Sequence, residues 1–143
     1  MTAPTLQKCR QAAYFKDCFH RKEHDNDRST QHQSALIKWS QLPQIRERYP
    51  ELKLLHHIPN GGKRDPIEAK HLKAQGVKPG VPDLCLPVAR GNFHGLYIEM
   101  KTETGRPSDN QKWWIKELND QKYKAVICHG WEEAKKCLTD YLS

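Results

Sequence analysis

Two acids and a lysine stand out in the segment GVPDLCLPVARGNFHGLYIEMK, residues 80–101. Asp83 follows a proline at the start of one apolar run, and Glu99 and Lys101 are separated by one residue in the next run. Because side chains alternate between the faces of a strand, Glu99 and Lys101 are expected to share a face with Tyr97. If the two runs form a hairpin, Asp83 comes close to Glu99 and Lys101 at one end of the sheet.

This grouping of side chains is suited to binding a metal ion. Two carboxylates close together repel each other, and a divalent cation between them removes the repulsion. Mg²⁺ prefers oxygen ligands, and the main-chain carbonyl of Met100 could supply a third. Such a cation activates water and polarises a phosphoryl oxygen, and Lys101 could orient the water or stabilise charge on the phosphate. An ordinary exposed Glu–Lys strand face with a turn residue at Asp83 would give the same spacing.

The surrounding sequence predicts the elements that position these residues. Four apolar runs are typical of strands: 52–58, 83–88, 95–101 and 124–130. The last run is expected in the centre of the sheet, and the loop between the second and third is short enough for a hairpin. Capping residues and apolar periodicity predict helices from Ser29 or Thr30 to about Pro43, over 65–75, from Ser108, and over 131–142. This order predicts an α/β fold with a mixed central sheet flanked by helices.

Composition limits the classes of partner. The chain has 143 residues, which suits one domain, a formal net charge of +7 and a pI of about 9.2. A basic protein attracts polyanions, so nucleic acid is the first partner to consider, although a basic surface can also serve solubility alone. No apolar run approaches the roughly 18 residues that span a bilayer, and the first residues lack the apolar stretch of a signal peptide. We therefore expect an intracellular, cytoplasmic protein with no membrane partner.

Three motifs in order resemble one nuclease family. They are PNGG at 59–62, GVKPGVPDL at 76–84 and EMKTETGRPSDNQ at 99–111. Their order and spacing resemble the virus-type replication-repair nuclease (VRR-NUC) domain of the PD-(D/E)xK superfamily. The resemblance covers about residues 30–135. It implies a restriction-endonuclease-like core, which we place over 29–143. The residues before it are moderately helical in character, so we expect an N-terminal helical extension over 1–28.

The resemblance also implies an activity and its residues. The reaction is phosphodiester hydrolysis that requires Mg²⁺ or Mn²⁺, with Asp83 and Glu99 as metal ligands and Lys101 as the catalytic lysine. Short members of the family are similar to phage-encoded Holliday junction resolvases, which implies branched DNA, a four-way junction, as the substrate and a bacterial or phage-infected cell as the setting. A homodimer is expected, because a two-fold protein matches the two symmetric strands of a junction.

Two alternatives to junction cleavage remain open at this point. One is a flap or single-strand nuclease. The other is a DNA-binding module that has lost cleavage, because the sequence departs from the family in its first core helix. Many relatives carry a glutamate there, whereas this chain offers Gln31 and Gln33. An amide can bind water at a metal but adds no charge, so a second metal is left undecided.

Other residues have both a structural and a functional interpretation. Gln111 either reaches the active site or only completes a capping box with Ser108, and both can hold. Of the adjacent Trp113 and Trp114, one must point away from the buried side of its helix and could anchor a dimer interface. Candidate DNA contacts, which could equally form a plain turn and a solvated basic face, are Asn60, Gly61, Gly62, Lys63, Arg64 and Lys78.

Overall fold

The computed structural model describes residues 27–60 and 65–143 of the chain. Almost all of the predicted N-terminal helical extension, residues 1–28, lies outside the described residues, as does the segment 61–64. Within the described part, none of the helices has the length and apolar character needed to cross a membrane.

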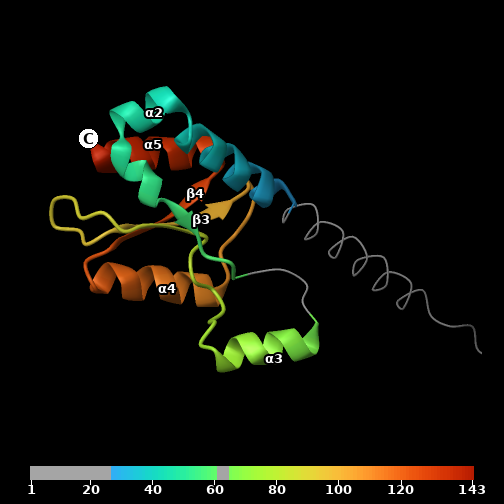
Figure 1. The fold of residues 1–143 in the computed structure, drawn as a ribbon. Coiled ribbons are helices and arrows are strands. Elements are labelled where there is room, and N and C mark those ends of the chain that lie inside the picture. The colour runs from blue at the N-terminus through green and yellow to red at the C-terminus, as the bar shows by residue number, and fades with distance from the viewer. Residues whose placement is uncertain (1–26, 61–64) are drawn as a thin grey trace, which may run out of the picture.

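A mixed four-stranded sheet forms the centre of the fold (Figure 1). Its strands are β1 (His56–His57), β2 (Leu84–Leu86), β3 (Leu96–Lys101) and β4 (Lys124–His129), in the spatial order β1-β2-β3-β4. β2 is antiparallel to both β1 and β3, and β4 is parallel to β3. The prediction of an α/β fold with a mixed sheet flanked by helices is therefore confirmed.

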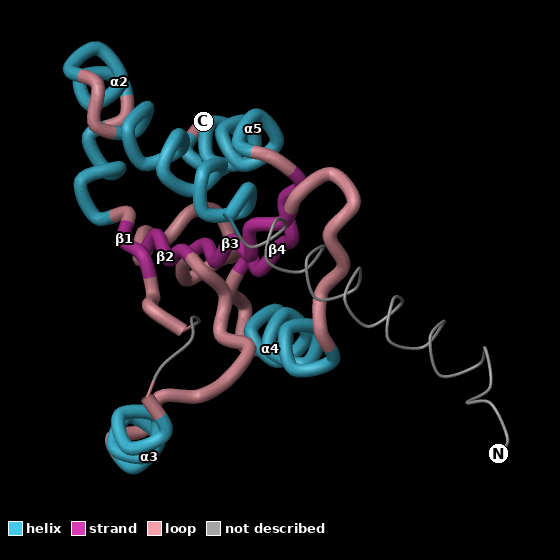
Figure 2. Tube along the Cα trace, turned by 90° about the vertical axis from the view of Figure 1, so that its right-hand side faces the viewer, coloured by secondary structure: helices cyan, strands magenta, loops and turns pink. Residues whose placement is uncertain are grey.

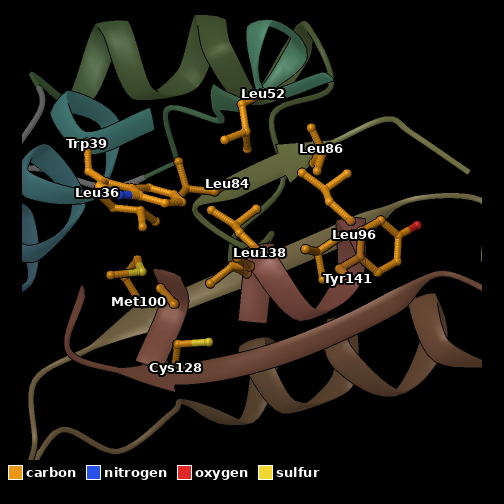
Figure 3. Packing of buried hydrophobic residues seen from close by; sticks show 13 residues of the cluster. Leu36, Trp39, Leu52, Leu84, Leu86, Leu96, Met100, Cys128, Leu138 and Tyr141 are labelled. Carbon is orange, nitrogen blue, oxygen red and sulfur yellow. The ribbon is translucent and has the colours of Figure 1, made fainter. Parts of the chain in front are cut away.

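Helices cover both faces of this sheet (Figure 2). One face carries the helix over 27–40, α2 (Pro43–Arg48), the 3₁₀ helix η1 (Pro50–Leu54) and α5 (Trp131–Leu142). The other face is covered by α4 (Asp109–Asp120), which connects β3 to β4. The main hydrophobic core lies on the first face (Figure 3), where side chains of β2 and β3 pack against the first helix and α5: Leu84, Leu96, Met100, Leu36, Trp39 and Leu138.

The position of β4 differs from the prediction. It was expected in the centre of the sheet, but among the described strands it lies at the edge and pairs only with β3. Its apolar character has another cause, because helices cover both of its faces. Cys128 is buried in the core on the α5 side, and Ala125 is buried on the α4 side. A strand covered on both faces is apolar even at an edge, so apolar content does not reveal its place in the sheet.

The strand predicted over 52–58 is also mostly wrong. Pro50–Leu54 forms η1, and only His56–His57 pairs with β2. Pro50 fits the first turn of a helix because its missing N–H has no partner there. Leu52 is fully buried in the core whereas Leu54 is 44% exposed. The apolar residues of this run therefore close one end of the core through a helical turn.

The helix predicted over 65–75 is present as α3 (Pro66–Ala74), but its cap differs from the prediction. The Asp65 side chain accepts a hydrogen bond from Ile67 N at 2.7 Å, without the reciprocal Glu68 contact of a capping box. None of the residues of α3 is buried. Figures 1 and 2 both show α3 set apart from the sheet and from the other helices.

The last two helices agree with the sequence. α5 covers the predicted residues, and α4 begins directly after Ser108 with the predicted capping box. Ser108 Oγ accepts from Gln111 N at 3.3 Å, and Ser108 N donates to Gln111 Oε1 at 2.8 Å. This box fixes the start of α4 beside the end of β3, where the candidate residues lie.

Candidate active site

The register of the β2–β3 hairpin brings the two acids together. Leu84 pairs with Ile98, so extending the register by one residue places Asp83 opposite Glu99 on the same face. The Asp83 carboxylate then closes the end of the hairpin, because its Oδ2 accepts a hydrogen bond from Met100 N at 2.8 Å. The expected convergence of Asp83 and Glu99 at one end of the sheet is therefore present.

Glu99 is a deeply buried carboxyl group. It is only 1% exposed, on a strand face that also carries polar side chains. Its Oε1 atom receives two donors, Lys101 Nζ at 3.0 Å and the side-chain amide of Gln111. Its Oε2 atom is buried and has no hydrogen-bond partner among the described residues. Burying such an atom without a partner costs free energy, so a positively charged partner at Oε2 would stabilise the site.

The pKa values of both acids reflect this burial. Burial, followed by the negative charge on Asp83, raises the pKa of Glu99 to about 7, while Lys101 and Gln111 oppose the shift. Burial also raises the pKa of Asp83, against the hydrogen bond from Met100 and the charge on Lys101. The raised values mean that the contacts of the two carboxylates with Lys101, Gln111 and Met100 N do not offset the cost of burying their charges.

Gln111 has both of the roles considered from the sequence. Its Oε1 completes the helix cap with Ser108, and its Nε2 donates to Glu99 Oε1. One side chain therefore links the start of α4 to the buried carboxyl group. The spacing Ser-x-x-Gln revealed the cap, but the second contact depends on how α4 packs against β3.

The first helix reaches the site through Ser29, a residue that the sequence did not single out. Ser29 Oγ donates to the main-chain carbonyl of Met100 at 3.1 Å. Gln31 is exposed, Gln33 is half-buried, and neither makes a hydrogen bond to the site within the described residues. The helical periodicity could not identify Ser29, because its partner is a carbonyl far along the chain.

The loop before β2 is held against α4 and β1. Gly80 has a φ of +85°, and a Cβ added there would lie 2.7 Å from the main chain and side chain of Asn110. Asn60 Nδ2 donates to Val81 O at 3.0 Å, two residues before Asp83. Both contacts fix the path of the chain into Asp83, so Asn60 has a structural role whatever it contacts in a substrate.

The other candidate DNA contacts divide into two groups. Lys78 is exposed, close in sequence to the exposed Lys70 and Lys73 of α3. The remaining candidates lie outside the described residues: Gly61, Gly62, Lys63 and Arg64.

Trp113 is 55% exposed, and its neighbour Trp114 donates from Nε1 to Pro79 O at 3.1 Å. The exposed indole is therefore Trp113, as expected for one of the two.

His129 is a further residue that the sequence did not identify. It pairs in register with Lys101, so both side chains lie on the α4 face at the same end of the sheet. Its Nδ1 lies 2.8 Å from Thr102 O, and its main-chain N–H donates to Glu133 Oε2 at 2.6 Å. A carbonyl partner requires a proton on Nδ1, which leaves Nε2 as the ring atom able to contact a substrate.

The residues present are compatible with a hard divalent cation. Asp83, Glu99 and the Met100 carbonyl offer oxygen atoms, which Mg²⁺ and Mn²⁺ prefer. The unpartnered Oε2 of Glu99 supports this, since it is a buried carboxylate oxygen without a donor. The protein supplies few side-chain ligands, because no group of three or more His, Cys, Asp or Glu side chains within 27–60 and 65–143 is arranged to hold a metal. A cation would thus depend on two carboxylates, the carbonyl, water and substrate.

Comparison with known proteins gives a consistent result. The VRR-NUC domain model matches residues 22–132. A solved structure described as a "VRR_NUC domain protein" is similar, with 31% sequence identity and a TM-score of 0.66, over 80% of this chain and 88% of that chain. None of the curated proteins matches. The matched residues include Asp83, Glu99, Lys101 and Gln111.

Proposed function

The chain belongs to the VRR-NUC domain family of nucleases, and we propose that it is a Mg²⁺- or Mn²⁺-dependent endodeoxyribonuclease that cleaves branched DNA. The proposed substrate is a four-way Holliday junction, and the proposed working form is a homodimer. The observation that carries the proposal is the convergence of Asp83 and Glu99 on one face beside Lys101, with a buried carboxylate oxygen left unpartnered.

Each residue of the site has a distinct role in this proposal. Asp83, Glu99 and the Met100 carbonyl hold the cation. A divalent cation, when bound, supplies positive charge that polarises the phosphodiester and acidifies water at the site. The Lys101 ammonium lies 3.0 Å from Glu99 Oε1, where it can orient the attacking water and stabilise negative charge on the phosphate. Gln111 holds Glu99 in place through its side-chain amide.

The charge of the chain supports a nucleic-acid substrate. The formal net charge is +7, and exposed lysines lie on α3 and in the loop that leads to Asp83: Lys70, Lys73 and Lys78. Lysines of this kind bind phosphates without reading base sequence, so we expect recognition of DNA shape. Cleavage rate should then vary with the branching of the substrate more than with its sequence.

A homodimer is proposed from the symmetry of the substrate. A four-way junction presents two equivalent strands, and a two-fold dimer places one active site on each. Trp113, 55% exposed on α4, is a candidate anchor for the subunit contact, since exposed tryptophans are common at the centre of interfaces. Light scattering on the purified chain would test this directly. A monomer at working concentrations would remove the argument for paired symmetric cuts.

The proposed substrate is tested by comparing the cleavage of different DNA structures side by side. End-labelled four-way junctions, flaps, single strands and plain duplexes of shared sequence are incubated with the chain in Mg²⁺, in Mn²⁺ and in EDTA. We expect paired nicks on the four-way junction, the fastest cleavage on that substrate, and none in EDTA. If the flap or the single strand were cleaved faster than the junction, that structure would be the preferred substrate instead. Binding of the junction without cleavage in either metal would favour a binding module.

A further inference from the structure

We propose that His129 gives a proton from Nε2 to the oxygen that leaves the phosphorus when a DNA strand is cut. This proposal deepens the proposed function and rests on it, because it assigns a further catalytic residue to the same reaction. It concerns the β4 side of the site, whereas Asp83 and Glu99 come from the β2–β3 hairpin. Three features of His129 support it: its position in the sheet, its fixed ring and its free nitrogen atom.

His129 lies at the same end of the sheet as the candidate site, one strand beyond Lys101. The two residues pair across the parallel strands β3 and β4, so their side chains share the α4 face. Neighbouring strands lie about 4.8 Å apart, and the main chain of His129 is one such spacing from that of Lys101. The side chain of His129 is exposed, so a DNA strand bound at Lys101 can reach it.

Two hydrogen bonds hold His129 in place and leave its Nε2 atom free. Nδ1 lies 2.8 Å from Thr102 O, so Nδ1 carries a proton, and the main-chain N–H donates to Glu133 Oε2 at 2.6 Å. Within 27–60 and 65–143, no residue forms a hydrogen bond with Nε2. A protonated imidazole can therefore donate from Nε2 while it keeps its bond to Thr102, as a positioned proton donor requires.

The order of the strands indicates which oxygen of the phosphate His129 meets. Asp83 precedes β2 on one side of β3, and His129 ends β4 on the other side. In the proposed function the phosphate lies at Lys101, and the attacking water is held on the side of the two acids. Phosphoryl transfer keeps the attacking and leaving oxygens roughly in line on opposite sides of the phosphorus. The leaving oxygen therefore faces the β4 side, where His129 offers Nε2.

The proton transfer completes the cleavage step. The water oxygen forms a bond to phosphorus, and the bond from phosphorus to the bridging oxygen breaks, with its electron pair going to that oxygen. The bridging oxygen takes the Nε2 proton of His129 and leaves as a hydroxyl group. The imidazole is then neutral and takes a new proton from the solvent, which also receives the proton lost by the attacking water.

His57 provides a matched comparison on the opposite side of the site. Its Nδ1 lies 2.8 Å from Asp83 O, so its ring is also held through a carbonyl. It belongs to β1, however, which lies beyond β2 and therefore on the side of the acids. A histidine in this position does not face the leaving oxygen. The two histidines thus have similar contacts and different expected effects on the departure of that oxygen.

The test replaces the leaving oxygen by sulfur. The wild type first identifies the cut position and the leaving oxygen on an ordinary four-way junction, and a second junction carries sulfur at that bridging atom. A thiolate is a much weaker base than an alkoxide, so it leaves without a proton donor. His129→Asn keeps a side-chain N–H for Thr102 O but has no group in the position of Nε2.

Single-turnover cleavage of both junctions is measured in Mn²⁺. On the oxygen-bridged junction, we expect His129→Asn to cleave about 100-fold more slowly than the wild type. On the sulfur-bridged junction, the two proteins should cleave at the same rate. For His57→Asn, any change in rate should be the same on both junctions.

The outcomes that contradict the proposal are distinct from failure of the proposed function. An equal loss by His129→Asn on both junctions would mean that His129 only holds the segment at Thr102, and would overturn the proposal. An undiminished rate of His129→Asn on the oxygen-bridged junction would also overturn it, as would rescue of His57→Asn by sulfur. In these cases the wild type still cuts the ordinary junction. A wild type that does not cut it would overturn the proposed function itself.

Discussion

Two neighbouring residues of β3, Ile98 and Glu99, are equally buried and affect the molecule in opposite ways. Each is 1% exposed. Ile98 faces the core formed with the first helix and α5, and burial of such a side chain contributes about 1.5–3 kcal/mol to stability. Glu99 faces α4, where burial raises the pKa of its carboxyl group to about 7, so its charged form destabilises the protein without a cation.

The comparison shows how a strand separates stability from chemistry. Alternation places Leu96, Ile98 and Met100 in the core and leaves Glu99 and Lys101 on the other face. The core face holds β3 in position, and the polar face can then carry groups whose burial costs free energy. Local departures from efficient burial are typical of functional sites. Substitutions on the two faces should therefore have separable effects on stability and on cleavage.

The largest effect is expected from Lys101→Met on the polar face. Loss of an ammonium that stabilises charge in the transition state should lower the single-turnover rate of junction cleavage by about 100- to 1,000-fold. Binding of the junction should persist, because the exposed lysines are unchanged. Cleavage and binding are measured on the same labelled junction. Lys116→Met serves as the control and should cleave at the wild-type rate. Wild-type cleavage by Lys101→Met would remove the lysine from the mechanism.

On the core face, Ile98→Ala should produce the opposite pattern. Removing a buried isoleucine side chain is expected to lower the free energy of unfolding by about 2–5 kcal/mol. The cleavage rate per folded molecule should stay at the wild-type value, because Ile98 does not face the site. Urea denaturation measures the first quantity, and cleavage under conditions where the variant is folded measures the second. If a folded Ile98→Ala chain failed to cleave, the two faces would not be independent.

The polar face also predicts a pH dependence of stability in EDTA. The pKa of Glu99 is raised from 4.5 to about 7 in the folded protein, so the folded chain retains a proton there that the unfolded chain releases. Stability should therefore fall as pH rises through this window, by roughly 3 kcal/mol from this group. Glu99→Gln has no titrating carboxyl group at this position, so its free energy of unfolding should rise relative to that of the wild type as pH rises.

Urea denaturation of both proteins across this pH window tests the sign of the effect. The difference between the two chains isolates Glu99 from the other titrating groups. A difference that stays constant with pH would show that the buried carboxyl group has an ordinary pKa. Saturating Mg²⁺ should reduce the difference, since a bound cation stabilises the charged form of Glu99.

The smallest effects are expected from two variants that distinguish the contact of Gln111 with Ser108 from its contact with Glu99. Ser108→Ala removes the hydroxyl half of the capping box and should cost about 1 kcal/mol of stability, with cleavage unchanged because the Gln111 side chain is kept. Gln111→Ala keeps the Ser108 Oγ contact but removes the Gln111 side-chain half of the capping box and the donor to Glu99, so it should also lower cleavage by about 10-fold. Thermal unfolding and cleavage are measured for both variants. Equal cleavage by the two would mean that Gln111 only caps α4.

Local features of the fold could be predicted from the sequence. The alternation of β3, the cap at Ser108 and the extent of α5 each depend on residues close together in the chain. The meeting of Asp83 with Glu99 was also predictable, because two consecutive apolar runs pair as a hairpin and their buried residues fix its register.

Features that depend on distant packing could not be predicted in this way. The edge position of β4 depends on which strands pair, and the apolar run of η1 has the same composition as a strand. Ser29 reaches Met100 only because the start of the first helix lies beside the end of β3, whereas the resemblance pointed to Gln31 and Gln33 of that helix. His129 joins Lys101 only through the parallel pairing of β3 and β4.

The most direct test of the account is single-turnover cleavage of a four-way junction in Mg²⁺ by Asp83→Asn beside the wild type. Asparagine keeps the shape of the side chain and an oxygen for the Met100 N–H, but removes one of the two charges proposed to hold the cation. We predict junction binding close to that of the wild type and cleavage reduced by at least about 100-fold. Cleavage by Asp83→Asn at the wild-type rate would contradict the account.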